Sequence, residues 1–121
     1  MTKSKLKQYL NQNPNTNSIE LLDYLNTPEM MEYSNGKYWY LKGKLHRKDG
    51  PAVEHKSGHK EWWTNGKRHN EDGPAIIWAS GTKKWYINGK LHREDGPAIE
   101  YSSGDKYWYL NDKFIRVSRN N

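Results

Sequence analysis

Residues 85–98 read Trp-Tyr-Ile-Asn-Gly-Lys-Leu-His-Arg-Glu-Asp-Gly-Pro-Ala, and this stretch is the fullest copy of a unit that recurs along the chain every 23 residues. The recurring landmarks are Trp39, Trp62, Trp85 and Trp108; His46, His69 and His92; and the Gly-Pro-Ala triplets beginning at Gly50, Gly73 and Gly96. A fixed period of this length is typical of a repeat protein, in which each unit packs on its neighbours. Four copies can be traced, and the outer two are imperfect.

Each copy contains two short runs of β-forming residues separated by turn residues. Residues 75–79 and 83–87 flank a Ser80-Gly81 turn, a pattern that predicts a β-hairpin. The first copy is one residue shorter here, so a two-residue Asn35-Gly36 turn is expected in it. Terminal repeats are commonly atypical in this way.

A second chain reversal follows each hairpin, at residue pairs that tolerate left-handed backbone. These pairs are Lys42-Gly43, Asn65-Gly66, Asn88-Gly89 and Asn111-Asp112, of which the two Asn-Gly pairs are the stronger signals. The Asp-Gly-Pro segment bends the chain again, and its proline supplies no backbone donor at the start of the next strand. The sequence therefore predicts a mainly β fold: a single-layer, antiparallel, twisted sheet of tandem hairpin repeats over residues 31–121.

Alternation along the strands assigns side chains to the two faces of this sheet. In the first strand of each copy, the positions of Val53, Ile76 and Ile99 share a face with His55, Trp78 and Tyr101. In the second strand, the Trp column faces opposite to the column Tyr40, Trp63, Tyr86 and Tyr109. Both faces therefore carry aromatic rings.

Residues 1–30 precede the repeats and show helical spacing of apolar residues in two segments, 4–10 and 18–25. Pro14 lies in the loop between them, and Thr27-Pro28 ends the second segment. Helices this short are unstable alone. We therefore expect them to form an α-helical cap on the end of the sheet, with a partner-docking arm as the alternative.

The composition limits the classes of protein to which the chain can belong. Its 121 residues are too few for a large enzyme fold, but six Trp and nine Tyr supply buriable area despite a mean hydropathy of −1.23. The absence of cysteine excludes disulfides and thiolate metal sites. With neither a signal peptide nor a membrane span expected, the predicted location is the cytoplasm.

The net charge of +6 lies entirely in the repeats, because three Lys and three acidic residues balance within residues 1–30. A basic surface rich in aromatic rings attracts nucleic acids, nucleotides or acidic protein faces.

At the motif Trp-Tyr-x-Asn-Gly-Lys-Leu-His-Arg-x-Asp-Gly-Pro-Ala, residues 31–117 resemble MORN-like hairpin-repeat proteins, especially a divergent variant common in tailed bacteriophages and large DNA viruses. The resemblance implies an elongated single-layer scaffold of viral origin, from a family that usually binds proteins or lipids and has relatives among bacterial antitoxins. The His-Arg-x-Asp-Gly-Pro-Ala segment and the Trp-rich second strand depart from the standard MORN pattern, so lipid binding is not carried over. The family brings no catalytic residue.

The candidate binding residues are aromatic and basic side chains at repeated positions. They are Tyr40, Trp63, Tyr86, Tyr109, Lys60, Lys83, Lys106, Arg47 and Arg93. Together they can form a cationic stacking surface. The alternative is that the lysines only keep a repetitive sheet soluble and block edge pairing.

A His-x-x-Asp pattern recurs at His46-Asp49, His69-Asp72 and His92-Asp95. A histidine oriented by a carboxylate can act as a general base or ligate a metal. Three equivalent copies favour a structural turn instead, because an active site is normally single. We therefore assign no catalytic residue, no metal ligand and no cofactor.

These observations favour a non-enzymatic protein-binding module, and the resemblance implies a phage-encoded inhibitor of a host defence protein. The first alternative is a binder or sponge for a nucleotide or a single-stranded nucleic acid. The second is a nuclease or cyclic-nucleotide hydrolase that uses His92 and Asp95. No membrane partner is expected, and open strands at the chain ends can pair between copies.

Overall fold

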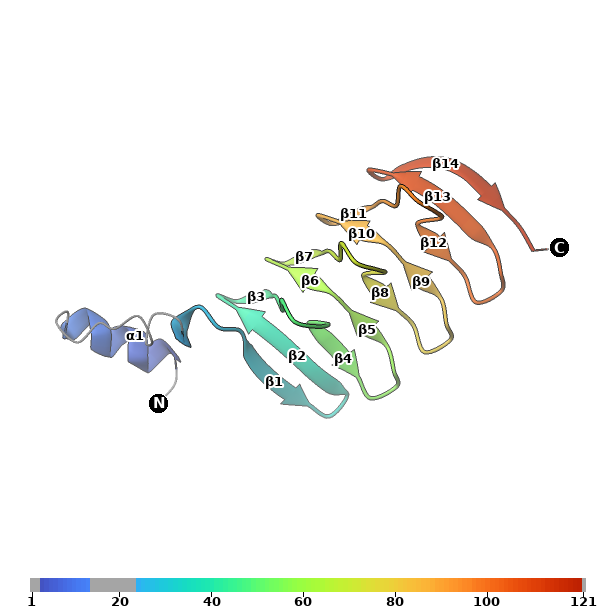
Figure 1. The fold of residues 1–121 in the computed structure, drawn as a ribbon. Helices are drawn as coiled ribbons and strands as arrows, with labels where there is room; N and C mark the ends of the chain where they lie inside the picture. Colours follow the sequence, from blue (N-terminus) through green and yellow to red (C-terminus); the bar gives the residue numbers. More distant parts are fainter. Residues whose placement is uncertain (1–2, 14–23, 121) are drawn as a thin grey trace.

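The computed structural model describes residues 3–13 and 24–120, and its strands follow one another in a row (Figure 1). Ten strands form one antiparallel sheet in the order β1-β2-β4-β5-β8-β9-β12-β13-β14, with β3 paired to β2. Two further ribbons, β6-β7 and β10-β11, extend individual hairpins. The predicted mainly β, single-sheet fold built from hairpins is confirmed.

The bounds of the elements are as follows. They are α1 (Lys3–Gln12), β1 (Glu29–Tyr33), β2 (Gly36–Leu41), β3 (Lys44–Leu45), β4 (Val53–His55), β5 (Lys60–Glu61), β6 (Trp63–Thr64), β7 (Lys67–Arg68), β8 (Ile76–Ile77), β9 (Lys83–Lys84), β10 (Tyr86–Ile87), β11 (Lys90–Leu91), β12 (Ile99–Glu100), β13 (Lys106–Leu110) and β14 (Lys113–Ser118).

The second reversals adopt the predicted left-handed backbone. The φ angles are 51° at Lys42, 49° at Asn65, 50° at Asn88 and 48° at Asn111. Asparagine tolerates this conformation better than other residues with a Cβ, whereas a lysine adopts it at a cost. Of these four residues, Lys42 is therefore the most strained.

The first hairpin turn differs from the prediction by one residue. Tyr33 pairs with Gly36, so the two turn residues are Ser34 and Asn35, and Gly36 already belongs to β2. The glycine is needed for a close approach: a Cβ at Gly36 would lie 2.2 Å from the carbonyl oxygen of Glu54 in β4. The predicted Asn35-Gly36 turn was therefore wrong.

Register defines the two faces of the sheet, because paired residues point to the same side. One row of paired positions contains Tyr38, Val53, Glu61, Ile76, Lys84, Ile99 and Tyr107. We call this side the aromatic face. The opposite side, which carries Trp39, Trp62, Trp85 and Trp108, is the tryptophan face.

The buried core is small and repeats with the same period. Val53, Ile76 and Ile99 are 3–5% exposed on the aromatic face. The alanines that precede them, Ala52, Ala75 and Ala98, are fully buried. Alternation along the strand places these two columns on opposite faces, and no other large cluster of buried side chains is present within residues 24–120.

The N-terminal region is described in part. The predicted first helix is confirmed as α1, and most of the predicted second helix lies outside the described residues, with Tyr24 and Leu25 helical. Figure 1 shows α1 beyond the β1 edge of the sheet. Met30, Met31 and Tyr33 of β1 stay 43–48% exposed, so α1 leaves much of this strand uncovered. Across the described ranges, no helix has the length and apolarity that crossing a bilayer requires.

Candidate functional site

The four predicted ring positions, Tyr40, Trp63, Tyr86 and Tyr109, lie on the aromatic face. Tyr40 follows Tyr38 by two residues within β2. Trp63 Nε1 donates a hydrogen bond to Glu61 Oε1 (3.2 Å), and the guanidinium of Arg68 lies over the rings of both Trp63 and Tyr86. The structure therefore brings these rings to one side of the sheet.

The predicted basic residues lie on the tryptophan face. Lys60 and Lys83 each precede a residue of the aromatic face, Glu61 and Lys84, within a strand, so they point to the opposite side. Lys106 occupies the same position in β13. The nine candidate residues therefore do not form one surface.

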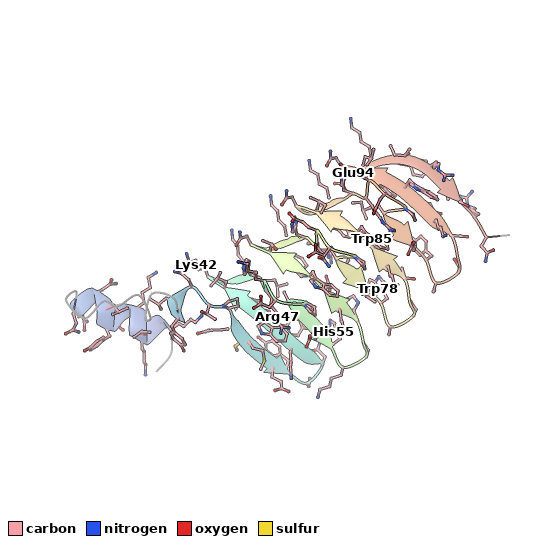
Figure 2. All side chains as sticks on the ribbon, in the orientation of Figure 1. Lys42, Arg47, His55, Trp78, Trp85 and Glu94 are labelled. Carbon is pink, nitrogen blue, oxygen red and sulfur yellow. The ribbon has the colours of Figure 1, made fainter. Side chains whose placement is uncertain are left out.

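Arg47, labelled in Figure 2, and its equivalent Arg93 make structural contacts on the tryptophan face. Arg47 stacks on Trp39 at 3.8 Å and Arg93 on Trp85 at 3.9 Å. Each guanidinium also donates a 3.1 Å hydrogen bond to a carbonyl oxygen of its own loop, that of Pro51 or Pro97. These contacts fix each Asp-Gly-Pro loop over a Trp ring.

The lysines of the tryptophan face stand beside acidic residues on neighbouring strands. Glu54 pairs in register with Lys60 on one side, and Glu100 pairs with both Lys83 and Lys106. Opposite charges in such positions attract each other weakly. The register therefore breaks up the continuous positive stripe that a nucleic-acid track requires.

The recurring histidines join each repeat to the next. The Nδ1 atoms of His46, His69 and His92 accept hydrogen bonds of 2.9–3.0 Å from backbone N–H groups 19 residues ahead. The Nε2 atoms of His69 and His92 lie 3.4 Å from Glu71 and Glu94, which are exposed. This geometry supports the structural interpretation of the motif, and Asp95 contacts Arg93 instead (3.1 Å).

A ladder of rings crosses the aromatic face from β1 to the loop after β8, and sequence reasoning missed it as a unit. Consecutive ring centroids are 5.3 Å apart for Tyr33–Tyr38, 5.7 Å for Tyr38–His55, 5.0 Å for His55–His59 and 4.2 Å for His59–Trp78. Edge-to-face and tilted contacts at these distances are favourable for aromatic rings. The ladder is therefore a continuous aromatic strip across several hairpins.

A second ring cluster occupies the other end of this face. Tyr107 contacts Tyr101 at 5.5 Å and Phe114 at 6.4 Å, and Phe114 contacts Tyr109 at 5.7 Å. Several rings of the two groups are well exposed: 48% for Tyr33, 42% for Trp78, 40% for Tyr101 and 54% for Phe114.

Glu61 sits at the centre of a polar network within the ring ladder. Its Oε1 atom accepts hydrogen bonds from Arg68 Nε (3.0 Å) and Trp63 Nε1 (3.2 Å), and its Oε2 lies 2.9 Å from His59 Nε2. Burial raises the pKa of Glu61, but the hydrogen bonds from His59 and Arg68 outweigh burial, so the pKa falls below its usual value. The carboxylate is therefore ionised at neutral pH.

Burial raises the pKa values of two tyrosines on this face. For Tyr40 the neighbouring Tyr33 and Tyr38 add to the effect of burial. For Tyr86 burial exceeds the opposing influence of Arg68. Both hydroxyl groups therefore remain neutral hydrogen-bonding groups at physiological pH.

A groove of about 830 Å³ lies between α1 and the β1-β2 end of the aromatic face. Among the described residues it is lined by Lys3, Lys7 and Lys42 and by Tyr33 and Tyr40. Glu29, Met31 and a few smaller side chains complete the lining. Three lysines and two tyrosines therefore line one surface here.

Two signals in the sequence could have revealed the ladder. The first is alternation, which placed His55 and Trp78 on one face; the second is the departure from the repeat at His59 and Glu61. The register between hairpins, which brings these positions into contact, could not be read from spacing alone.

Comparison of the chain with protein-family models, with curated proteins and with solved structures returned no match.

Proposed function

We propose that this chain is a non-enzymatic protein-binding module whose aromatic face docks onto a partner protein. The observation that carries the proposal is the band of exposed rings on that face, including Tyr33, Trp78, Tyr101 and Phe114. These four side chains are 40–54% exposed, so the described helices and strands leave each of them largely uncovered. Tyrosine and tryptophan supply large contact areas at protein interfaces, and exposed apolar bands mark such sites.

The separation of rings from lysines favours a protein over a nucleic acid as the partner. Binding of a single strand combines stacking on rings with a positively charged groove along the phosphates. In the central repeats Trp63 and Tyr86 lie on the aromatic face, whereas Lys60, Lys83 and Lys106 lie on the tryptophan face. A protein partner can dock on exposed rings without a positively charged groove beside them.

The resemblance to the MORN-like repeats of phages extends the proposal. It predicts that the partner is a host protein, such as a component of a defence system, that the chain inhibits in the host cytoplasm. This extension rests on the repeat motif of residues 31–117.

An affinity pull-down with matched surface variants tests the proposal. The bait is the tagged chain, exposed to extract of the cells in which it acts, with and without nuclease and high salt. Substituting Trp78→Ala together with Tyr101→Ala removes exposed rings, whereas Lys60→Ala with Lys83→Ala changes the tryptophan face. We expect a protein that resists nuclease and salt to be lost with the ring variant and kept with the lysine variant.

The opposite pattern, loss with the lysine variant alone, would exclude docking through the aromatic face. Circular dichroism of both variants shows whether the sheet is intact.

The groove beside α1 favours one second candidate, binding of a nucleotide. Three lysines provide charge for phosphates, and Tyr33 and Tyr40 provide rings for a base. Its volume of about 830 Å³ suits a small ligand. Titration with a fluorescent nucleoside triphosphate measures this directly: Lys42→Ala should weaken binding several-fold, and the affinity should fall steeply with salt.

A further inference from the structure

Three potential metal ligands converge on one hairpin of the aromatic face. His55 ends β4, His59 directly precedes β5, and Glu61 lies within β5. Each side chain offers a ligand atom, and these atoms all lie within 4.8 Å of one another. Within residues 3–13 and 24–120, no other group of three His or acidic side chains meets this distance condition.

The three positions depart from the repeat together. The residues equivalent to His55 are Trp78 and Tyr101, those equivalent to His59 are Thr82 and Asp105, and those equivalent to Glu61 are Lys84 and Tyr107. The framework residues of this copy, such as Trp62 and His69, keep the pattern. The ligand-type side chains are therefore specific to this hairpin and are not required by the repeat architecture.

His59 carries a buried ring nitrogen that has no partner. The residue is 8% exposed, lying between the rings of His55 and Trp78. Its Nε2 lies 2.9 Å from Glu61 Oε2, and in the tautomer that donates this hydrogen bond Nδ1 presents a lone pair. No hydrogen-bond donor of the described residues reaches that buried Nδ1. Buried polar atoms normally find a partner, so this one points to a missing ligand.

Glu61 is held in place by its other oxygen. Arg68 and Trp63 both donate to Oε1, which leaves Oε2 directed at the histidine pair. Hydrogen bonds of this kind orient the carboxylates and imidazoles of metal sites.

We propose that His55, His59 and Glu61 form a binding site for a divalent transition-metal ion such as Zn²⁺. Two imidazoles and a carboxylate suit Zn²⁺, whereas Mg²⁺ and Ca²⁺ prefer oxygen ligands alone. A tetrahedral site with bonds of about 2.0–2.2 Å separates its ligand atoms by roughly 3.3 Å. Because the three ligand atoms already lie within 4.8 Å of one another, the side chains would have to rotate only slightly to reach that spacing.

The ion would bridge the two strands on either side of the 56–58 turn. His59 can bind it through Nδ1 while Glu61 holds Nε2, or through Nε2 together with the Glu61 oxygen. In the first arrangement Glu61 positions His59, and the two histidines bind the ion; in the second, Glu61 is itself the third ligand. Water or a group of a docked partner would fill the remaining positions of a tetrahedral site.

Isothermal titration calorimetry of the intact protein with ZnCl₂, after treatment with EDTA and its removal, tests the proposal. We expect one Zn²⁺ per chain and a loss of affinity of at least about tenfold in each of His55→Ala, His59→Ala and Glu61→Gln. The matched control is His92→Ala, which removes a framework histidine of another copy and should leave Zn²⁺ binding unchanged.

Titration with Co²⁺ adds a spectroscopic readout, because its visible absorption reports the coordination geometry. The side chain of His55 contacts the rings of Tyr38 and His59, and its removal in His55→Ala leaves the backbone pairing of the hairpin in place. If His59→Ala does not fold, the Zn²⁺ affinity of His55→Ala tests the proposal. A wild-type chain that takes up no Zn²⁺ at up to about 1 mM would overturn the proposal. Binding that His55→Ala leaves unchanged, or that His92→Ala weakens equally, would overturn it too.

Discussion

The imidazole at positions 46, 69 and 92 acts as a hydrogen-bond acceptor between repeats. Nδ1 of His69 accepts the backbone N–H of Asn88 at 2.9 Å, at the left-handed turn of the following copy. A side chain that places an acceptor at the position of Nδ1 can replace it, and one that cannot leaves the turn amide to water.

Asparagine and glutamine at position 69 therefore have different expected effects. His69→Asn can present its Oδ1 atom near the position of Nδ1, whereas the longer side chain of His69→Gln cannot. We expect His69→Gln to lower the free energy of unfolding by about 1 kcal/mol and His69→Asn by clearly less, as measured by urea denaturation. Equal losses in the two variants would show that ring packing, and not the acceptor, matters.

Individual residues differ in how far their roles could be predicted. Repetition alone identified His46, His69 and His92 as structural, since three copies of one motif favour a framework role. The roles of Arg47 and Arg93 were not visible, because charge suggested an exposed binding surface while the stacking on Trp39 and Trp85 depends on the path of a loop. His59 and Glu61 became a cluster only through the hairpin that brings them together.

At the scale of the hairpin, two positions change together between copies. Arg47 lies 3.4 Å from Glu54, and Arg93 lies 3.5 Å from Glu100. The copy between them has Asn70 and Ile77 at these positions. Asn70 still bonds the carbonyl oxygen of Pro74 (2.9 Å), so the loop tie survives while the ion pair is replaced by an apolar side chain.

This paired change predicts a coupling between the two positions. Ile77→Glu exchanges an apolar side chain for a carboxylate that faces Lys60 and Lys83 on the neighbouring strands, but it lacks the arginine that Glu54 and Glu100 contact. Combining it with Asn70→Arg should restore that ion pair, so the double variant should be more stable than the sum of the two single changes predicts. We expect a coupling free energy of about 0.5–1 kcal/mol from a double-mutant cycle in urea. Additive effects would mean that the two positions vary independently.

The turn at Lys42 offers a stabilising substitution. Its φ of 51° places a lysine in the conformation that asparagine occupies at positions 65 and 88. Lys42→Asn should therefore raise the free energy of unfolding by about 0.5–1 kcal/mol, and the reverse change, Asn88→Lys, should lower it by a similar amount. Thermal denaturation of both variants checks the sign; a destabilised Lys42→Asn would contradict the argument.

Turn chemistry accounts for what was predictable at this scale. The Asn-Gly pairs and the Ser80-Gly81 turn located the hairpins correctly, since few residues tolerate these backbone angles. The first hairpin was misplaced by one residue because Gly36 serves close strand packing against Glu54 and not the turn itself. In the sequence, a glycine needed for a turn looks the same as one needed for close strand packing.

At the scale of the whole array, each hairpin of residues 24–120 pairs with its neighbours along the row and with no other described segment. The edge strands β1 and β14 have a partner on one side only, whereas β8 and β9 lie between other strands. Stability in such arrays is carried by neighbouring units, so opening starts at the ends.

Hydrogen exchange of backbone amides should show this gradient directly. We expect the slowest exchange in the central strands β5, β8 and β9 and progressively faster exchange toward β1 and β14. Mass spectrometry of peptic peptides or NMR resolves the difference. Uniform protection across the sheet would instead indicate a single cooperative unit.

The 23-residue period was sufficient to predict one open sheet, since hairpins of this length with alternating faces have few other ways to pair. The arrangement at the N-terminus could not be predicted in the same way. Short helices take their position from the surfaces that they contact, and the groove beside α1 combines residues separated by about forty positions, from Lys3 to Lys42.

The two faces of the sheet also differ in how freely their side chains can vary between copies. The bonds that hold one copy to the next involve the backbone, the recurring histidine and the loops on the tryptophan face, so side chains such as His55, Trp78 and Tyr101 are free to differ at equivalent points. A duplicated unit can therefore be added to the row and later acquire its own surface without any rearrangement of the older units. Proteins built in this manner can lengthen their binding surface and change its selectivity by adding or altering one repeat at a time.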